Sequence, residues 1–207
     1  EPRMEVVELK TKYPQGGERQ LIFACTGRAI NSKMLPADAG CIVDNVETIL
    51  AVYDAVKYGM PVMKRVSCIS GDAVVNPSNF LYSIGTSYAE LVEAAGGFKS
   101  EPEKIISGGP MMGFPLNDLN VPMMKGSNGL IAIDTDQTEP VDCIKCGRCV
   151  DVCPMELSPL YFAKYADQEN WQGMKDMKVM DCVECRCCEF ICSSKIPIVT
   201  KIKAGKN

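Results

Sequence analysis

The chain has 207 residues, a net charge of −4 at pH 7 and a hydrophobic content of 46%. A chain of this length forms one to three small domains, and its hydrophobic content is enough for a packed core. The acidic balance argues against a nucleic-acid-binding protein, which usually has a clustered basic surface. No stretch approaches the roughly 20 apolar residues of a membrane-spanning helix, so we expect the chain itself to be soluble.

The first part of the chain, to about residue 60, predicts mixed α/β structure. A strand is expected at residues 4–9 and a helix at residues 18–27. A second helix is expected at residues 45–58, because apolar side chains recur there at helical spacing. Gly59 and Pro61 follow this stretch and would end the helix.

The middle part, from about residue 61 to residue 135, predicts a small sheet with one helix across it. The helix is expected at residues 87–95, before Gly96 and Gly97. Turn signals separate short strand patterns. These patterns lie at residues 62–69, 79–84, 104–106 and 130–133.

The last part, from about residue 136 to residue 207, predicts almost only helices. They are expected at residues 157–168, 170–177 and 196–203. Eight cysteines lie here in two runs that form an internal repeat, offset by 39 residues (143 and 182). The three parts together predict an α+β protein.

The cysteine and histidine contents are unusual, with 12 cysteines and no histidine. Without histidine the chain can form no His-ligated zinc or haem site, and it lacks the commonest general base of hydrolases. Twelve thiols indicate either disulfide bonds in a secreted protein or metal in a cytosolic one. No secretion signal is visible, which favours metal.

The first cysteine run has the C-x2-C-x2-C-x3-C-P spacing of bacterial iron–sulfur proteins. Three of its thiolates can converge on one cubane, and Gly147 permits the backbone to come close. The fourth cysteine points away, towards a second cluster. The run consists of Cys143, Cys146, Cys149 and Cys153, followed by Pro154.

The second run repeats this spacing with Cys182, Cys185, Cys188 and Cys192. Arg186 and Ser193 replace the glycine and the proline, and Cys187 is additional. As in two-cluster ferredoxins, we expect the two ligand sets to cross over. The predicted ligands are Cys143, Cys146, Cys149 and Cys192 for cluster one, and Cys182, Cys185, Cys188 and Cys153 for cluster two.

Zinc is the rival metal, because two CxxC pairs can form an all-thiolate zinc site. A duplicated set of four cysteines favours iron–sulfur clusters over one zinc ion. The remaining cysteines predict structural roles. Cys25, Cys41 and Cys68 are expected in the core, and Cys187 could be a spare ligand.

Several separate segments resemble the C component of the Rnf electron transport complex, known as the RnfC family, in the same order along the chain. They are residues 12–21, 35–41, 44–48, 70–74 and 106–114, and the two cysteine runs complete the match. The resemblance covers nearly the whole chain. It implies a partial α/β flavin-domain remnant at residues 1–60, a small SLBB-like β-grasp domain at residues 61–135 and a helical two-cluster ferredoxin domain at residues 136–207.

The flavin domain of this family is similar to the flavoprotein subunit of respiratory complex I. Its glycine-rich nucleotide loop is absent from this sequence, and the resemblance begins about halfway through the domain. Gly16, Glu18 and Asn45 look like positions that contact FMN in the related flavoproteins. We expect neither FMN nor NADH on this chain; the resemblance implies them only for the intact subunit.

The resemblance implies electron transfer through two [4Fe–4S] clusters, in an ion-translocating oxidoreductase complex that couples ferredoxin and NAD. The expected partners are the other Rnf subunits, with ferredoxin and NAD(H) reached through the complex. The expected place is the cytoplasmic side of the bacterial inner membrane, as a peripheral subunit. We do not expect this chain alone to be catalytic. The alternative is a docking module with a structural metal cluster or zinc and no redox role.

Overall fold

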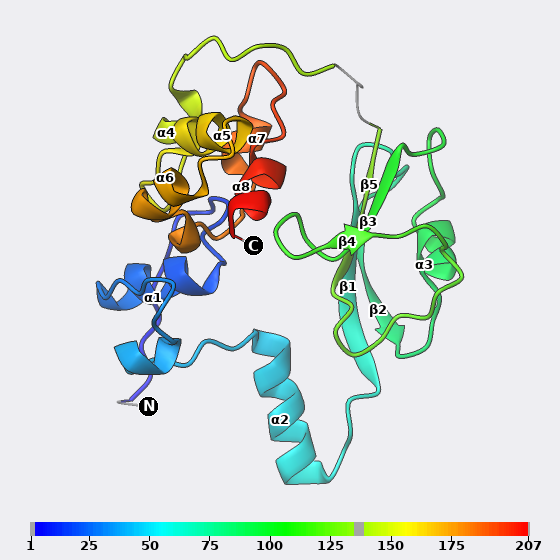
Figure 1. Cartoon of the computed structure of the whole chain (residues 1–207). Helices are drawn as coiled ribbons and strands as arrows, with labels where there is room; N and C mark the ends of the chain where they lie inside the picture. The colour runs from blue at the N-terminus through cyan, green and yellow to red at the C-terminus, as the bar shows by residue number, and fades with distance from the viewer. Residues whose placement is uncertain (1–2, 135–138, 207) are drawn as a thin grey trace. The chain divides into compact units, whose positions relative to one another are not determined.

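The computed structural model describes residues 3–134 and 139–206 and has a mixed α+β fold (Figure 1). These residues form two compact units. The helical unit contains the residues up to Asp44 together with those from Glu139 onward, and the sheet unit contains the residues between them. Within the described ranges, no helix is long and apolar enough to cross a membrane.

The sheet unit is built on five strands in the order β2-β1-β5-β3-β4. The first and last strands in sequence, β1 and β5, pair in parallel, and the other neighbours pair antiparallel. The first and last strands of the sheet in sequence therefore lie side by side at its centre. The strands are β1 (Lys64–Ser70), β2 (Ser78–Ser83), β3 (Lys104–Ser107), β4 (Phe114–Pro115) and β5 (Gly129–Ile133).

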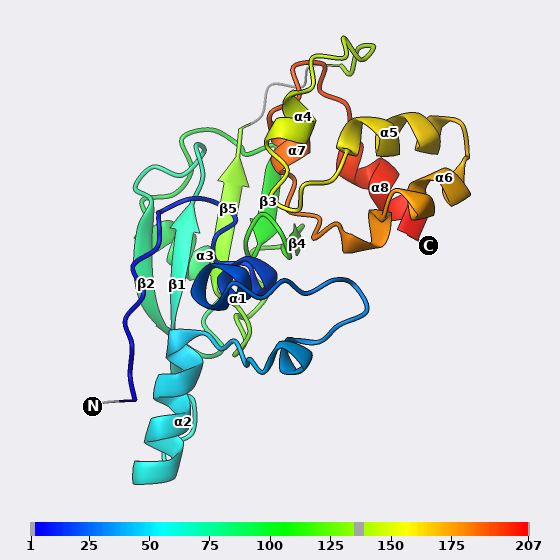
Figure 2. The same cartoon turned by 90° about the vertical axis from the view of Figure 1, so that its left-hand side faces the viewer.

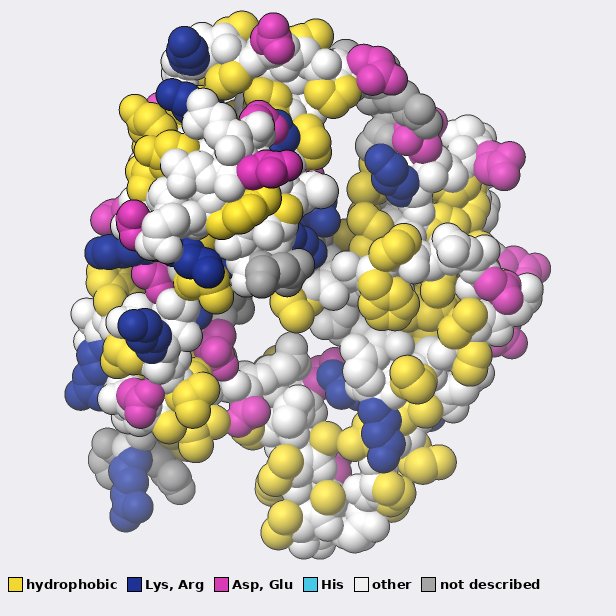
Figure 3. Space-filling view, viewed as in Figure 1, with side chains coloured by type: hydrophobic (Ala, Val, Ile, Leu, Met, Phe, Trp, Pro, Cys, Tyr) yellow, Lys and Arg dark blue, Asp and Glu magenta, His cyan; other side chains and the backbone are white. Residues whose placement is uncertain are grey.

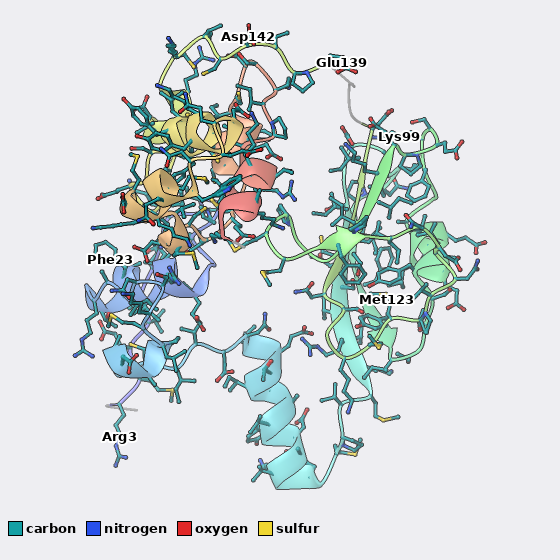
Figure 4. The ribbon with its side chains drawn as sticks, viewed as in Figure 1. Arg3, Phe23, Lys99, Met123, Glu139 and Asp142 are labelled. Carbon is teal, nitrogen blue, oxygen red and sulfur yellow. The ribbon has the colours of Figure 1, made fainter. Side chains whose placement is uncertain are left out.

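Helix α3 (Tyr88–Ala94) packs on this sheet and closes its core. It begins at Ser87, whose hydroxyl accepts from the N–H of Glu90 while the Glu90 carboxylate accepts from the N–H of Ser87. This reciprocal cap satisfies two N–H groups that would otherwise lack partners. The core beneath the helix includes Ile69, Val74, Tyr82, Leu130 and Met123, the last labelled in Figure 4.

Gly71 follows β1 at a point where the backbone has no room for a side chain. Its φ is +114°, and a Cβ would lie 1.9 Å from the carbonyl oxygen of Ala132. We expect Gly71→Ala to destabilise the sheet unit by on the order of 3 kcal/mol. Denaturant unfolding measures this loss.

The matched control is Gly85→Ala, because Gly85 has a φ of +100° but no atom within 4 Å of its added Cβ. Only the unfavourable backbone conformation then contributes, at about 1 to 2 kcal/mol. An equal loss in the two variants would show that close approach to Ala132 does not matter.

Helix α2 (Val46–Tyr58) also belongs to the sheet unit, but none of its residues is buried. The Asn45 side chain caps it by accepting from the N–H of Glu47. The Glu47 carboxylate in turn accepts from the N–H of Val66 in β1 and pairs with Arg65 at 3.1 Å. Val56 and other hydrophobic side chains of α2 are exposed. Figure 3 shows hydrophobic side chains on the surface of this helix.

The helical unit carries the internal repeat in its backbone. Its second half repeats the first at the offset seen in the sequence: α4 (Arg148–Asp151) corresponds to α7 (Cys187–Phe190), and α5 (Pro159–Asp167) corresponds to α8 (Ile198–Lys206). Helices α5 and α8 pack against each other around Phe162 (Figure 2). The remaining elements are α1 (Glu18–Thr26), η1 (Pro36–Ala39), α6 (Trp171–Asp176) and η2 (Val179–Asp181).

The structure confirms the predicted helices and the four predicted strands, but the strand predicted at residues 4–9 is wrong. Those residues form no helix or strand and are mostly exposed, and no strand among the described residues pairs with them. Cys25 and Cys68 were expected in the core and are exposed, whereas Cys41 is half-buried. The predicted domain boundaries stay a prediction, and the one at residue 135 lies outside the described residues.

Candidate metal centre

The structure gathers the eight cysteines of the two runs into two groups, each drawn from both runs. The first site has a cavity of about 460 Å³, and the second site has one of about 20 Å³. In both, the fourth cysteine of one run joins the first three of the other. The first site contains Cys143, Cys146, Cys149 and Cys192, and the second contains Cys153, Cys182, Cys185 and Cys188.

Left-handed residues shape both loops at equivalent positions. Lys145 and Glu184 have φ values of 56° and 55°, and Gly147 and Arg186 have values of 80° and 65°. These turns curl each loop so that its first three cysteines line one cavity. In both loops a backbone N–H lies 3.4 Å from a cysteine Sγ: Lys145 donates to Cys143, and Glu184 donates to Cys182. Such donors stabilise negative charge on sulfur.

Backbone hydrogen bonds tie the two runs into one folding unit. The N–H of Val141 donates to the carbonyl of Ser194 at 3.0 Å, and the Ser194 hydroxyl donates to the carbonyl of Asp142 at 3.0 Å. At the other end, the Lys206 ammonium donates to the carbonyl of Cys182 at 2.7 Å. The start of each run is therefore held by a residue that follows the second run.

At the first site, the pKa of one cysteine reflects the other three cysteines of the same group. Burial raises the pKa of the Cys149 thiol, and the neighbouring thiols of Cys143, Cys146 and Cys192 raise it further. These three neighbours are the remaining members of the first site. A bound cation would offset this effect and hold Cys149 as a thiolate.

The second site shows the same effect more strongly. Burial, together with Cys182, Cys185 and Cys153, raises the pKa of Cys188 to about 12. Burial also raises the pKa of Cys185 to about 11. Bound iron would supply the positive charge that keeps these thiolates deprotonated.

The donor set of both sites fits a [4Fe–4S] cluster, which is held by four cysteine thiolates. Across residues 3–134 and 139–206, no group of three or more Cys, Asp or Glu side chains is close enough to hold a single metal ion. Cysteines spread around a cavity suit a polynuclear cluster better than one zinc ion. At the second site, whose cavity is small, the four cysteine thiols are the feature that matches a [4Fe–4S] cluster.

Cys187 lines neither cavity and is half-buried between two residues of the second site. Its side chain hydrogen-bonds with that of Cys185, but it lies outside both groups of four that line the cavities. The assignment of all eight ligands stays a prediction, to which this grouping adds support.

Asp181 is a residue near the second site that sequence reasoning missed. Its carboxylate accepts from the N–H of Ser32 at 2.6 Å, and its carbonyl accepts from Arg19 at 3.2 Å. Burial raises the pKa of this carboxyl, but the Ser32 bond and the charges of Arg19 and Lys178 outweigh it and bring the pKa below its ordinary value. These contacts join residues at least 149 positions apart, and no local pattern signals them.

The three residues that resemble FMN-contacting positions of related flavoproteins lie at the starts of helices. Gly16 lies in the turn before α1, Glu18 begins α1, and Asn45 caps α2. Gly16 and Glu18 belong to the helical unit and Asn45 to the sheet unit. Their use in flavin binding stays a prediction.

Three family models match consecutive parts of the chain. The one described as "Nuo51 FMN-binding domain" matches residues 1–54, and "SLBB domain" matches residues 66–115. The one described as "4Fe-4S dicluster domain" matches residues 142–196, which include all eight cysteines of the two sites. The dicluster match implies two [4Fe–4S] clusters and confirms the predicted cofactors, while the FMN-binding domain is only partly present.

Three curated relatives match 84–99% of the chain, and all three are C components of oxidoreductase complexes. The chain is 46% identical to that of the proton-translocating ferredoxin:NAD(+) oxidoreductase complex of Clostridium ljungdahlii, over 84% of this chain and 39% of the relative. It is 42% identical to that of the Na(+)-translocating ferredoxin:NAD(+) oxidoreductase complex of Acetobacterium woodii, over 99% of this chain and 47% of the relative. The C component of the ion-translocating oxidoreductase complex of Pseudomonas aeruginosa is 42% identical, over 97% of this chain and 26% of the relative. The chain spans less than half the length of these relatives.

Proposed function

Because the chain belongs to the RnfC family, which forms the C component of ion-translocating ferredoxin:NAD(+) oxidoreductase complexes, we propose that it relays electrons through its two [4Fe–4S] clusters. The observation that carries this proposal is the grouping of eight cysteines into two crossed sets of four. In the complete protein, the relay would connect a flavin domain with the rest of the complex. No side chain of this chain acts as an acid, a base or a nucleophile in it.

The residues of the two sites bind and shield the clusters, which supply one-electron transfer when bound. Cys143, Cys146, Cys149 and Cys192 would hold the first, and Cys153, Cys182, Cys185 and Cys188 the second. Burial of Cys188 and Cys149 limits access of water to the sulfurs. Solvent access and hydrogen bonds to sulfur set the potential of such clusters.

The partners follow from the names of the relatives, which describe components of translocating ferredoxin:NAD(+) oxidoreductase complexes. We propose that this chain works with the other subunits of such a complex and reaches ferredoxin and NAD(H) through them. Its proposed place is the cytoplasmic side of the bacterial inner membrane, bound through those subunits.

Iron and sulfide analysis tests the cofactor content. Anaerobically purified protein is expected to contain about eight iron and eight sulfide per chain, because each cubane holds four of each. The protein should be brown and bleach with dithionite, and the reduced form should give EPR signals. Stoichiometric zinc without sulfide would rule out the relay.

A docking module with redox-inactive clusters is the competing function, and Cys149→Ser separates the two. The variant loses a buried ligand of the first site. In an assembled complex we expect electron transfer through this chain to fall by about 100-fold or more, since the relay is interrupted. Assembly, followed by co-purification of the subunits, should be retained. Normal electron transfer would favour docking.

A further inference from the structure

We propose that the segment before Asp44 caps the second site, so that the second cluster is the flavin-side end of the relay and the first cluster is its outward end. This inference rests on the proposed relay function and concerns the order of the clusters within it. The family model for an FMN-binding domain covers this segment, which ties it to the flavin domain of the complete protein.

The first observation is a direct hydrogen bond from this segment to a ligand residue of the second site. The Tyr13 hydroxyl donates to the carbonyl of Cys185 at 2.8 Å, across 172 positions of sequence. Nearby, the Gln20 amide lies 3.1 Å from the sulfur of Met155, which lines the second cavity. Together with the contacts of Arg19 and Ser32 to Asp181, four residues of the segment hold the second site.

The second observation comes from comparing the two halves of the repeat. In the first run, the carbonyl of Asp142 accepts from the Ser194 hydroxyl, a residue of the cluster domain itself. The equivalent carbonyl in the second run belongs to Asp181, and the equivalent of Ser194 is Met155, which has no hydrogen to donate. Arg19 donates to Asp181 instead. The N-terminal segment thus replaces a bond that the second half of the repeat cannot make.

The third observation is the difference in exposure between the sites. Cys143 and Cys146 of the first site are exposed, and Ile144 between them is 67% exposed. Their equivalents at the second site are less accessible, since Cys182 is half-buried and Cys185 is only 8% exposed. The third cysteine of each run is buried at both sites, at 9% for Cys149 and 7% for Cys188. The second site is therefore covered by the N-terminal segment, whereas two cysteines of the first site are open to solvent. Electron transfer slows steeply with distance, so the covered cluster is the one within reach of the flavin domain and the open one is within reach of an outside partner.

The first test measures solvent access in this chain with both clusters reduced. A dysprosium chelate in solution speeds the spin relaxation of nearby EPR signals. We expect strong relaxation enhancement for the first cluster and weak enhancement for the second. The variants Cys149→Ser and Cys188→Ser assign the signals to the first and second sites. Equal enhancement, or stronger enhancement for the second cluster, would overturn the proposal.

The second test removes one contact. Tyr13→Phe keeps the ring and deletes the bond to Cys185, so the EPR signal and midpoint potential of the second cluster should shift while those of the first stay unchanged. The matched control is Tyr161→Phe, because Tyr161 is exposed to a similar extent, 44% against 46%, and its hydroxyl makes no hydrogen bond among the described residues. A shift confined to the first cluster, or none at either, would contradict the capping role.

The third test addresses the order in a complete protein that includes the flavin domain, with dithionite as the control for cluster content. With Cys149→Ser, NADH should still reduce the second cluster. With Cys188→Ser, NADH should reduce the first cluster more slowly by about tenfold or more. If Cys149→Ser instead slowed NADH reduction of the second cluster and Cys188→Ser left that of the first unchanged, the proposed order of the clusters would be wrong, while the relay function would stand. If dithionite but not NADH reduces the clusters in the unaltered protein, the flavin-linked relay itself is wrong.

Discussion

Replacing Cys153 by serine is expected to remove the second cluster and leave the first, although Cys153 belongs to the first cysteine run. The structure places it with Cys182, Cys185 and Cys188, and its thiol raises the pKa of Cys188. Serine cannot supply a thiolate, so the second cluster would lose one of its four predicted ligands. Iron content should fall from about eight to about four per chain, and one of two reduced EPR signals should disappear.

Cys187→Ser is the matched control for this experiment. Cys187 is a cysteine within the second run that lines neither cavity, so its replacement should leave about eight iron per chain. If Cys153→Ser instead removed the first cluster, the ligands would not cross over. If Cys187→Ser removed the second cluster, the additional thiol would be a ligand and the assignment of that site would change.

Removing the iron with a chelator is expected to unfold the helical unit and leave the sheet unit folded. The longest helices of the helical unit, α1, α5 and α8, have nine residues each, which is too short for stability on their own. Five cysteines of the two sites belong to its core or contact it, so bound clusters would form part of that core. Binding of a structural metal contributes on the order of 10 kcal/mol, about as much as the whole net stability of a domain.

Hydrogen exchange before and after iron removal measures this effect in both units. Amides of α5 and α8 should lose their protection, whereas those of β1 and β5 should keep it. The sheet unit provides the internal control, because Ile69, Val74 and Leu130 form a core that contains none of the cluster cysteines. Retained protection in α5 and α8 would show that the packing around Phe162 suffices without metal.

Most of the local structure could be predicted because its signals are local. The helix at residues 45–58 follows from apolar spacing and a glycine stop, and the structure begins it one residue later, at Val46. The repeat predicted two similar halves, and the structure places α4 and α7, and α5 and α8, at the same offset. The very short elements η1, η2, α4 and α7 were not predicted, because three or four residues carry too little periodicity.

The errors concern residues whose state depends on distant partners. Residues 4–9 alternate like a strand, but a strand needs a neighbour for its backbone hydrogen bonds, and none is present among the described residues. Cys68 alternates with buried Ser67 and Ile69, so it lies on the opposite face of β1, which is exposed. An apolar neighbourhood in sequence does not tell which face of a strand is covered.

The sequence by itself determined the metal chemistry of this protein. The spacing of the cysteines within each run specifies an iron–sulfur loop, because three ligands of one cluster must lie within a few residues of one another. Only the tertiary structure decided what surrounds each cluster. Tyr13 meets Cys185 and Arg19 meets Asp181 across more than 160 positions, because burial and hydrogen bonding bring together residues that no local pattern connects. Those contacts distinguish two sites that look nearly identical in sequence: one capped by the N-terminal segment, the other facing solvent.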